Sequence, residues 1–138
     1  MRTNLVISSA VIVLLVAVAP VRAHHAFAAE FDANRPIKLT GAVTRVELIN
    51  PHAWIHIDVK GEDGKVTSWM VEGGSPNALL RRGFTRNTLE KGTVIVVEGY
   101  QAKDGMPRAN GRDITYQDGK KLFVGSSGTG APDERPEK

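Results

Sequence analysis

Short stretches of alternating apolar and polar residues, separated by turn residues, run through the chain from Ile37 to Val124. A period of two places alternate side chains on opposite faces of a β-strand, so this pattern restricts the chain to a sheet-based fold. It is clearest over residues 53–59, where apolar residues alternate with tryptophan, histidine and aspartate. The sequence therefore predicts an all-β domain over residues 37–124.

The first predicted strand is long and bent. Apolar residues alternate up to Val43 and resume at Val46, one residue out of phase, which is typical of a β-bulge. A hairpin follows, because the turn sequence Gly-Glu-Asp-Gly at residues 61–64 separates two β-like stretches, 53–59 and 66–72.

One short helix interrupts the strands. Ser75 is a good N-cap, Pro76 suits the first helical turn and Gly83 is well placed to end the helix. Three more strands are expected after it, at residues 93–100, 113–116 and 121–124. Five or six strands with a short helix between the third and the fourth predict an OB-like barrel, and an open β-sandwich built from the same strands is the alternative.

The first residues have the pattern of a secretory signal peptide. Arg2 is followed by an apolar stretch, Leu5–Ala19, and by Val-Arg-Ala at residues 21–23. The apolar stretch is shorter than the roughly 20 residues that span a bilayer as a helix, although an uncleaved anchor is the alternative. The predicted organisation is a signal peptide at 1–23, an irregular N-terminal arm at 24–36, the barrel at 37–124 and a disordered tail at 125–138.

These ends indicate a periplasmic or secreted protein that meets the membrane only during export. Removing residues 1–23 lowers the formal net charge from +3 to +1, which leaves no electrostatic basis for binding nucleic acid. The chain has no cysteine, so the domain must fold through its core without disulfides. Cleavage at the competing Ala-Phe-Ala sequence, residues 26–28, would remove the histidines discussed next.

Three histidines predict a metal site. If cleavage follows Ala23, His24 begins the mature chain, and its amino group and ring can chelate one ion together; His25 is next to it. His52 enters the second strand and would supply a nitrogen ligand from the barrel. Because imidazole suits copper and zinc and no thiolate is present, we expect Cu(II) or Zn(II), with copper favoured by the affinity order.

Other side chains are secondary candidates for this site. His56 shares a strand face with His52 only if the strand already begins at His52, and Glu72, which ends the third strand, is a carboxylate candidate. Asp58 has weaker support. The alternative for every one of these residues is an ordinary solvated or capping role.

Trp54 and Trp69 lie on the two strands of the predicted hairpin. Together they would form an aromatic surface for a small ligand, as OB barrels use; packing of one or both in the core is the alternative. Arg81, Arg82 and Arg86 are interpreted as a solvated basic face, and Asn77 as part of a capped helix start.

The sequence contains no recognisable catalytic constellation. Gly-x-Ser-x-Gly, His-Glu-x-x-His and phosphate-cradling loops are all missing from the 138 residues. We therefore expect a binding protein and not an enzyme.

Several motifs together resemble an uncharacterised family of small secreted bacterial proteins. The resemblance covers nearly all of residues 24–125, and its hallmarks are the His-His pair and the Asn-Pro-His sequence, which are His24, His25 and His52 here. It implies a periplasmic β-domain and supplies no activity. The motifs are His-His-Ala-Phe at 24–27, Ile-Asn-Pro-His-Ala-Trp at 49–54, Trp-Met-Val-Glu at 69–72, Ser-Pro-Asn at 75–77 and Leu-Arg-Arg-Gly at 80–83.

The sequence thus favours a small periplasmic protein that handles or delivers a transition-metal ion, with a periplasmic protein as a further partner. The first alternative is a metal-free binding module for a small ligand, a glycan or a partner protein. The second is a copper-dependent oxidoreductase, which rests on analogy with copper enzymes that use an N-terminal histidine.

Overall fold

The computed structural model describes residues 27–127, 129–132 and 135, and within them the chain forms six strands and two short helices. The elements in chain order are α2 (Phe27–Glu30), β1 (Phe31–Ile49), β2 (His52–Lys60), β3 (Val66–Glu72), α3 (Pro76–Arg81), β4 (Val94–Ala102), β5 (Arg108–Tyr116) and β6 (Lys121–Phe123).

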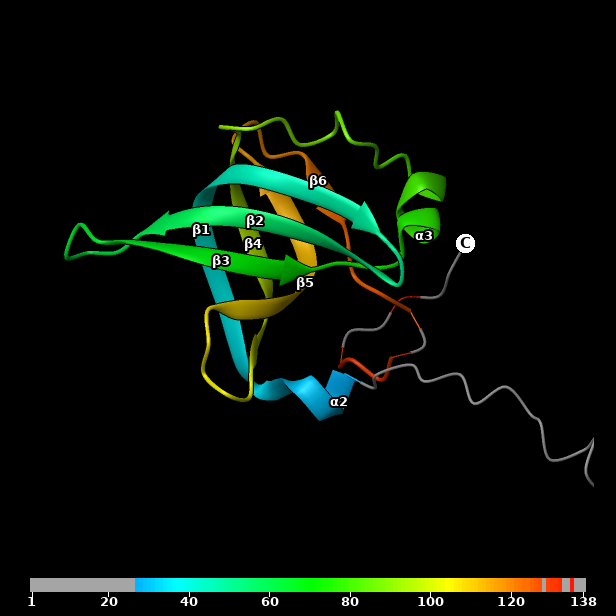
Figure 1. Ribbon diagram of the computed structural model, residues 1–138, viewed down its shortest axis with the longest axis horizontal. Helices are drawn as coiled ribbons and strands as arrows, with labels where there is room; N and C mark the ends of the chain where they lie inside the picture. Colours follow the sequence, from blue (N-terminus) through cyan, green and yellow to red (C-terminus); the bar gives the residue numbers. More distant parts are fainter. Residues whose placement is uncertain (1–26, 128, 133–134, 136–138) are drawn as a thin grey trace, which may run out of the picture.

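Five of the strands close into a ring, as Figure 1 shows. The sheet order is β3-β2-β1-β4-β5-β6, and β3 also pairs with β5. This closing pair is parallel and short, since it joins only Met70–Glu72 to Arg108–Asn110, whereas all the other pairs are antiparallel. The predicted all-β barrel is confirmed, and the open sandwich is wrong because β3 and β5 are paired.

β1 is long enough to serve two neighbours. Its first part pairs with β4 and its second part with β2. The register with β2 shifts between Val43 and Arg45, which is the position of the predicted bulge. A bulge bends the strand and increases its local twist, so it allows one strand to turn the corner of the barrel.

The short helix forms where it was predicted, between β3 and β4. The Ser75 hydroxyl accepts a hydrogen bond from the Ala78 backbone N–H at 3.3 Å, and Pro76 is the first helical residue. Gly83 follows the helix with a φ of 83°, a conformation in which glycine is favoured over other residues.

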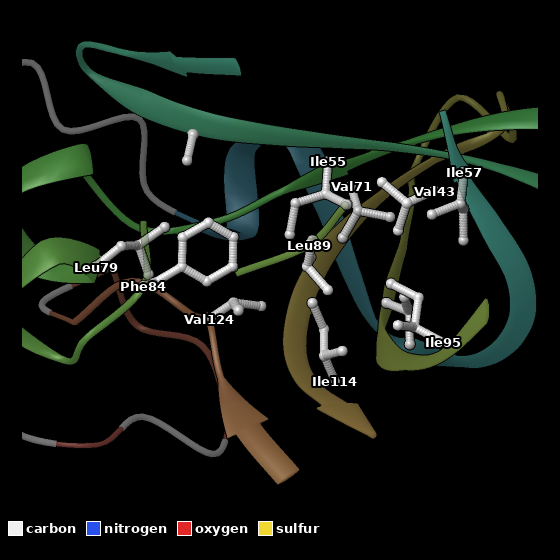
Figure 2. Packing of buried hydrophobic residues seen from close by; sticks show 12 residues of the cluster. Val43, Ile55, Ile57, Val71, Leu79, Phe84, Leu89, Ile95, Ile114 and Val124 are labelled. Carbon is white, nitrogen blue, oxygen red and sulfur yellow. The ribbon is translucent and has the colours of Figure 1, made fainter. Parts of the chain in front are cut away.

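Aliphatic side chains fill the barrel (Figure 2). Ile55, Ile57 and Val71 point inward from the hairpin β2–β3 and are fully buried. Leu79 of α3 and Phe84 join the same cluster from one end of the barrel. Because the interior is packed with hydrocarbon, a polar site has to lie outside the ring of strands.

A second apolar cluster lies on the outside of β4. Phe27 and Phe31 pack with Ala102 and Ala131, and Tyr100 borders the cluster. The Phe27 and Tyr100 rings meet edge-to-face, with 5.3 Å between their centroids. Burying both phenylalanines here attaches α2 to the wall of the barrel.

Two strand boundaries differ from the sequence predictions. β1 begins at Phe31, six residues before Ile37, so the described part of the expected irregular arm is helix and strand. β5 begins at Arg108, five residues before the predicted Asp113. In both places the sequence is rich in polar residues with glycine or proline, so its local pattern does not predict a strand. The strand forms because neighbouring strands pair with it, since strand propensity depends on context.

The segment after β6 also differs from the expected disordered tail. Gly125, Ser126 and Ala131 are buried. The Gly74 N–H donates to the Val124 carbonyl at 2.7 Å, and the Phe27 N–H donates to the Thr129 carbonyl at 2.9 Å. The described part of this segment therefore packs on the barrel through backbone hydrogen bonds.

The predicted signal peptide lies outside the described residues. Within them, no helix has the length and apolar character needed to cross a bilayer.

Candidate functional site

His52 and Glu72 come together where β2 begins and β3 ends. β2 starts at His52, directly after the cis Asn50–Pro51 bond, so the condition for His52, Trp54 and His56 to share a strand face is met. Glu72 is paired with Trp54 across the hairpin and therefore lies diagonally opposite His52 on that face. The His52 Nδ1 and Glu72 Oε1 atoms are 4.0 Å apart.

The His52 ring nitrogen facing Glu72 has no hydrogen-bond partner among the described residues. Its Nδ1 atom is buried, and the side chain as a whole is 20% exposed. A separation of 4.0 Å from the carboxylate is too long for a hydrogen bond. A buried polar atom without a partner is unusual in folded proteins and points to a ligand, ion or water that would complete it.

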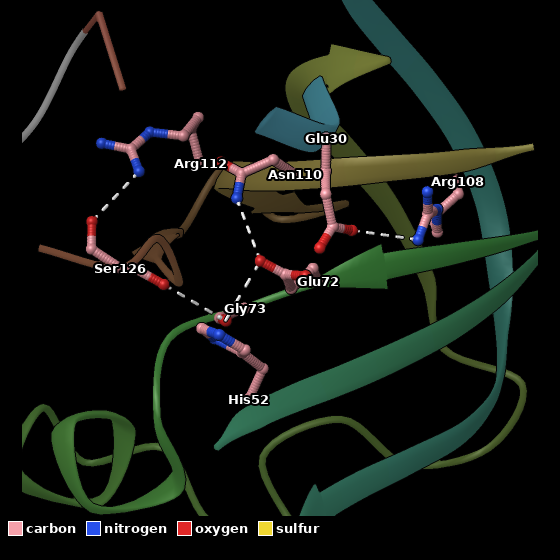
Figure 3. A network of polar contacts seen from close by, with 8 residues as sticks. All are labelled: Glu30, His52, Glu72, Gly73, Arg108, Asn110, Arg112 and Ser126. Carbon is pink, nitrogen blue, oxygen red and sulfur yellow. Dashed lines mark hydrogen bonds and ion pairs between the residues drawn. The ribbon is translucent and has the colours of Figure 1, made fainter. Parts of the chain in front are cut away.

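Asn110 of β5 lies on the other side of Glu72 (Figure 3). The parallel pair β3–β5 places the two residues opposite each other, and the Asn110 Nδ2 donates to Glu72 Oε1 at 3.5 Å. Asn110 is 2% exposed, and its Oδ1 is buried without a partner among the described residues. Two incompletely bonded polar atoms therefore flank one buried carboxylate.

The end of α2 lies close to this cluster. Arg108 precedes Asn110 by two residues on β5, and its Nη1 is 3.1 Å from Glu30 Oε2. The Arg108 guanidinium also faces the Phe31 ring at 5.8 Å. These contacts attach the end of α2 to the start of β5, where β5 pairs with β3.

His24 and His25 lie outside the described residues, so their predicted role as ligands stays a prediction. They precede Phe27 by three and two residues. Phe27, the first described residue, is buried in the second apolar cluster. From there, two residues extend over about 7 Å at most.

His56 belongs to a different cluster. Its Nε2 is 3.1 Å from Glu47 Oε2 and 3.3 Å from Arg45 Nη2. Four residues along a strand separate it from His52, a distance of about 13 Å. The shared face therefore does not bring the two rings to one ion, and Asp58 is bonded elsewhere, to the Ser68 hydroxyl at 2.6 Å.

Trp54 and Trp69 do not form one aromatic surface. Trp69 is paired with the buried Ile57 and packs against the main core, whereas Trp54 lies on the outward face with His52. The alternative of core packing is thus confirmed for Trp69. Trp54 is half-buried and lies about 7 Å along the strand from His52. Its fluorescence should therefore respond to ligand binding at the site.

The basic group after α3 is only partly a solvated face. Arg81 and Arg86 are exposed, as is Asn77. Arg82 instead donates from Nη1 to the Gly125 carbonyl at 2.8 Å and lies over the Phe123 ring. Its function in the described structure is to hold the segment after β6.

The described residues contain no group of three histidine, cysteine, aspartate or glutamate side chains arranged to hold a metal. His52 and Glu72 supply two donors, so a complete site needs further ligands. The sequence reasoning identified both of these residues but missed Asn110, because an Asn-Gly pair is typical of turns and its partner strand is distant in sequence.

Comparison with known proteins gives a family without an assigned activity. The model of a family of unknown function, DUF6152, matches residues 11–111. No curated protein matches the chain. Since the match covers well over half of the 138 residues, the chain belongs to the DUF6152 family.

Proposed function

We propose that this chain is a small periplasmic or secreted metal-binding protein that holds copper or zinc at His52 and Glu72 and handles or delivers the ion. The observation that carries the proposal is the buried Nδ1 of His52, which has no hydrogen-bond partner in the part of the chain that the structure describes and lies 4.0 Å from the Glu72 carboxylate. A positive ion between these atoms would complete the His52 Nδ1 and would be attracted by the carboxylate of Glu72.

The spacing supports an ion of this size. Zinc–nitrogen and zinc–oxygen bonds of about 2.0–2.2 Å with a tetrahedral angle place the two donor atoms about 3.4 Å apart. The pair must therefore close by roughly half an ångström, which a small rotation of either side chain supplies. Asn110 would hold the Glu72 carboxylate in orientation as an outer partner.

The remaining ligands in this proposal are His24 and His25. A chain that begins at His24 offers an amine and two imidazoles within three residues of Phe27. Nitrogen and oxygen donors without a thiolate suit Cu(II) and Zn(II), and copper has the higher intrinsic affinity. Sequencing the N-terminus of the exported protein tests whether processing leaves both histidines in place.

Copper titration of the exported protein tests the site. We expect one Cu(II) to bind per chain, and the change in fluorescence of the two tryptophans, of which Trp54 lies nearer His52, monitors the titration. The His52→Ala substitution should weaken binding by more than the roughly 10- to 100-fold that loss of an outer partner costs.

His56→Ala is the matched control, because it removes an imidazole from the same face of the same strand but from a different cluster. Equal affinity of the wild type, His52→Ala and His56→Ala would rule out the site. Binding of a small organic ligand in the presence of a chelator would support the metal-free module instead.

A further inference from the structure

The segment that follows β6 passes directly over the edge of the candidate metal site. The Ser126 hydroxyl donates to the Gly73 carbonyl at 3.4 Å, and Gly73 is the residue after Glu72. The next residue, Gly74, donates its N–H to the Val124 carbonyl at 2.7 Å. Figure 3 shows Ser126 and Gly73 beside His52 and Glu72.

Glycines make this close approach feasible. A Cβ atom on Gly73 would lie 3.2 Å from the Val124 carbonyl oxygen, and one on Gly74 would lie 3.1 Å from the Gly125 oxygen. A Cβ on Gly125 would meet the Arg112 guanidinium at 2.4 Å. The backbone of this segment is thus seated tightly against the strand end that carries Glu72.

Two arginines attach the segment from the other side. Arg82 donates to the Gly125 carbonyl at 2.8 Å, and the buried Arg112 donates to the Ser126 carbonyl at 3.2 Å. Both guanidinium groups also lie over the Phe123 ring, at 5.1 and 4.9 Å from its centroid. A charged group that donates to a backbone carbonyl forms a stronger hydrogen bond than a neutral one.

Further along, the same segment holds α2. The Thr129 carbonyl accepts from the Phe27 N–H at 2.9 Å, and Ala131, 5% exposed, packs with Phe27 and Phe31. A helix of four residues is not stable by itself. The position of α2 is therefore set by β4 on one side and by this segment on the other.

We infer that residues 124–127 and 129–131 form a strap that links the edge of the His52–Glu72 site to α2 and so sets the affinity of that site for its ion. This inference rests on the proposed function. The strap supplies no ligand; it positions the end of β3 and α2 relative to each other. Because coupling between two sites is reciprocal, ion binding should also tighten the strap on α2.

The test uses the exported chain with an Ala131→Asp substitution, which places a carboxylate among Phe27, Phe31 and Ala102. Ala33→Asp is the matched control, because Ala33 is exposed on β1. Hydrogen exchange of the peptide 27–31, followed by mass spectrometry, reports on the strap, and Cu(II) titration reports on the site.

We expect Ala131→Asp to accelerate exchange of this peptide about 10-fold or more and to weaken Cu(II) binding by about 10-fold, as loss of an outer partner does. Ala33→Asp should change neither by more than about 2-fold, and Cu(II) should slow the exchange in the wild type. If Ala131→Asp does not fold, the milder Ala131→Gly replaces it in the test. Ala131→Gly should also accelerate exchange of the peptide and weaken Cu(II) binding, each by a smaller factor.

Failure of the strap and failure of the site give different results. If Ala131→Asp accelerates exchange but leaves the Cu(II) affinity at the wild-type value, the strap does not act on the site. His52→Ala would still weaken Cu(II) binding in that case. If the wild type and His52→Ala bind Cu(II) equally, the site itself is wrong and the strap has no ion to control.

Discussion

Replacing His52 with alanine gives the sharpest test of its ring nitrogen, which has no partner among the described residues, because the substitution should be nearly neutral without metal and destabilising with it. In the metal-free protein, the buried Nδ1 costs about 1–3 kcal/mol, the usual penalty for an unsatisfied buried polar group. Removing the ring relieves that cost. It also removes the packing of a side chain that is 20% exposed, which contributes about 1–2 kcal/mol.

These two effects nearly cancel. We therefore expect the metal-free His52→Ala protein to unfold within about 1 kcal/mol of the wild type in urea, although truncation of a well-buried side chain usually costs more. A loss above about 2 kcal/mol would mean that the ring is hydrogen-bonded in the metal-free protein, and the reasoning from the unpartnered nitrogen would then be wrong.

With Cu(II) present the order changes. Free ion at 100 times its dissociation constant stabilises the wild type by about 2.7 kcal/mol, which raises the Tm of a domain of this size by about 11 °C. His52→Ala should lose most of this shift, while His56→Ala should keep it. An equal Tm shift in all three proteins would place the ion elsewhere.

Three further predictions concern the barrel itself. Gly99→Ala should destabilise the fold by about 3 kcal/mol in urea unfolding, because the new Cβ would lie 2.0 Å from the Asn110 carbonyl oxygen; a change below 1 kcal/mol would show that β4 and β5 separate easily. Ser75→Ala should cost about 1 kcal/mol through loss of the α3 N-cap, and an unchanged midpoint would contradict that role. Burial, with a smaller contribution from the charge of Asp118, raises the pKa of Tyr116 above its usual value of 10.0. The protonated Tyr116 side chain therefore stabilises the folded state fully below pH 10, and this stabilisation is lost as the pH rises through the raised pKa. Tyr116→Phe should therefore flatten the fall of unfolding free energy above pH 10, and identical pH profiles for both proteins would refute this.

The parts of the fold that are governed by local rules were predictable. A one-residue slip in apolar periodicity located the bulge between Val43 and Arg45, since a register change moves every side chain to the other face. Ser75, Pro76 and Gly83 located α3 by capping chemistry alone.

The parts that depend on long-range pairing were not predictable from the sequence. Asn110 meets Glu72 only because β3 and β5 close the ring in parallel, and no local pattern encodes a contact across 38 residues. The segment after β6 reads as polar tail, yet it is buried because Arg82 and Arg112 satisfy its carbonyl groups. A prediction of disorder from amino-acid composition fails where other parts of the protein supply hydrogen bonds to the backbone of the segment.

The division between core and outer layer separates stability from the proposed function. The barrel interior is aliphatic, so substitutions there, such as Val71→Ala, act mainly on the free energy of unfolding. His52, Glu72 and Asn110 lie on the outward face, next to Gly73, which the strap contacts, and α2 and the strap together form an outer layer on the barrel. Because that layer is held by a small number of hydrogen bonds, one ion pair and one small apolar cluster, it can loosen at a lower free energy than the barrel unfolds. A change at Ala131 should therefore alter ion affinity while leaving the urea midpoint of the barrel nearly constant, whereas a change at Val71 should do the reverse.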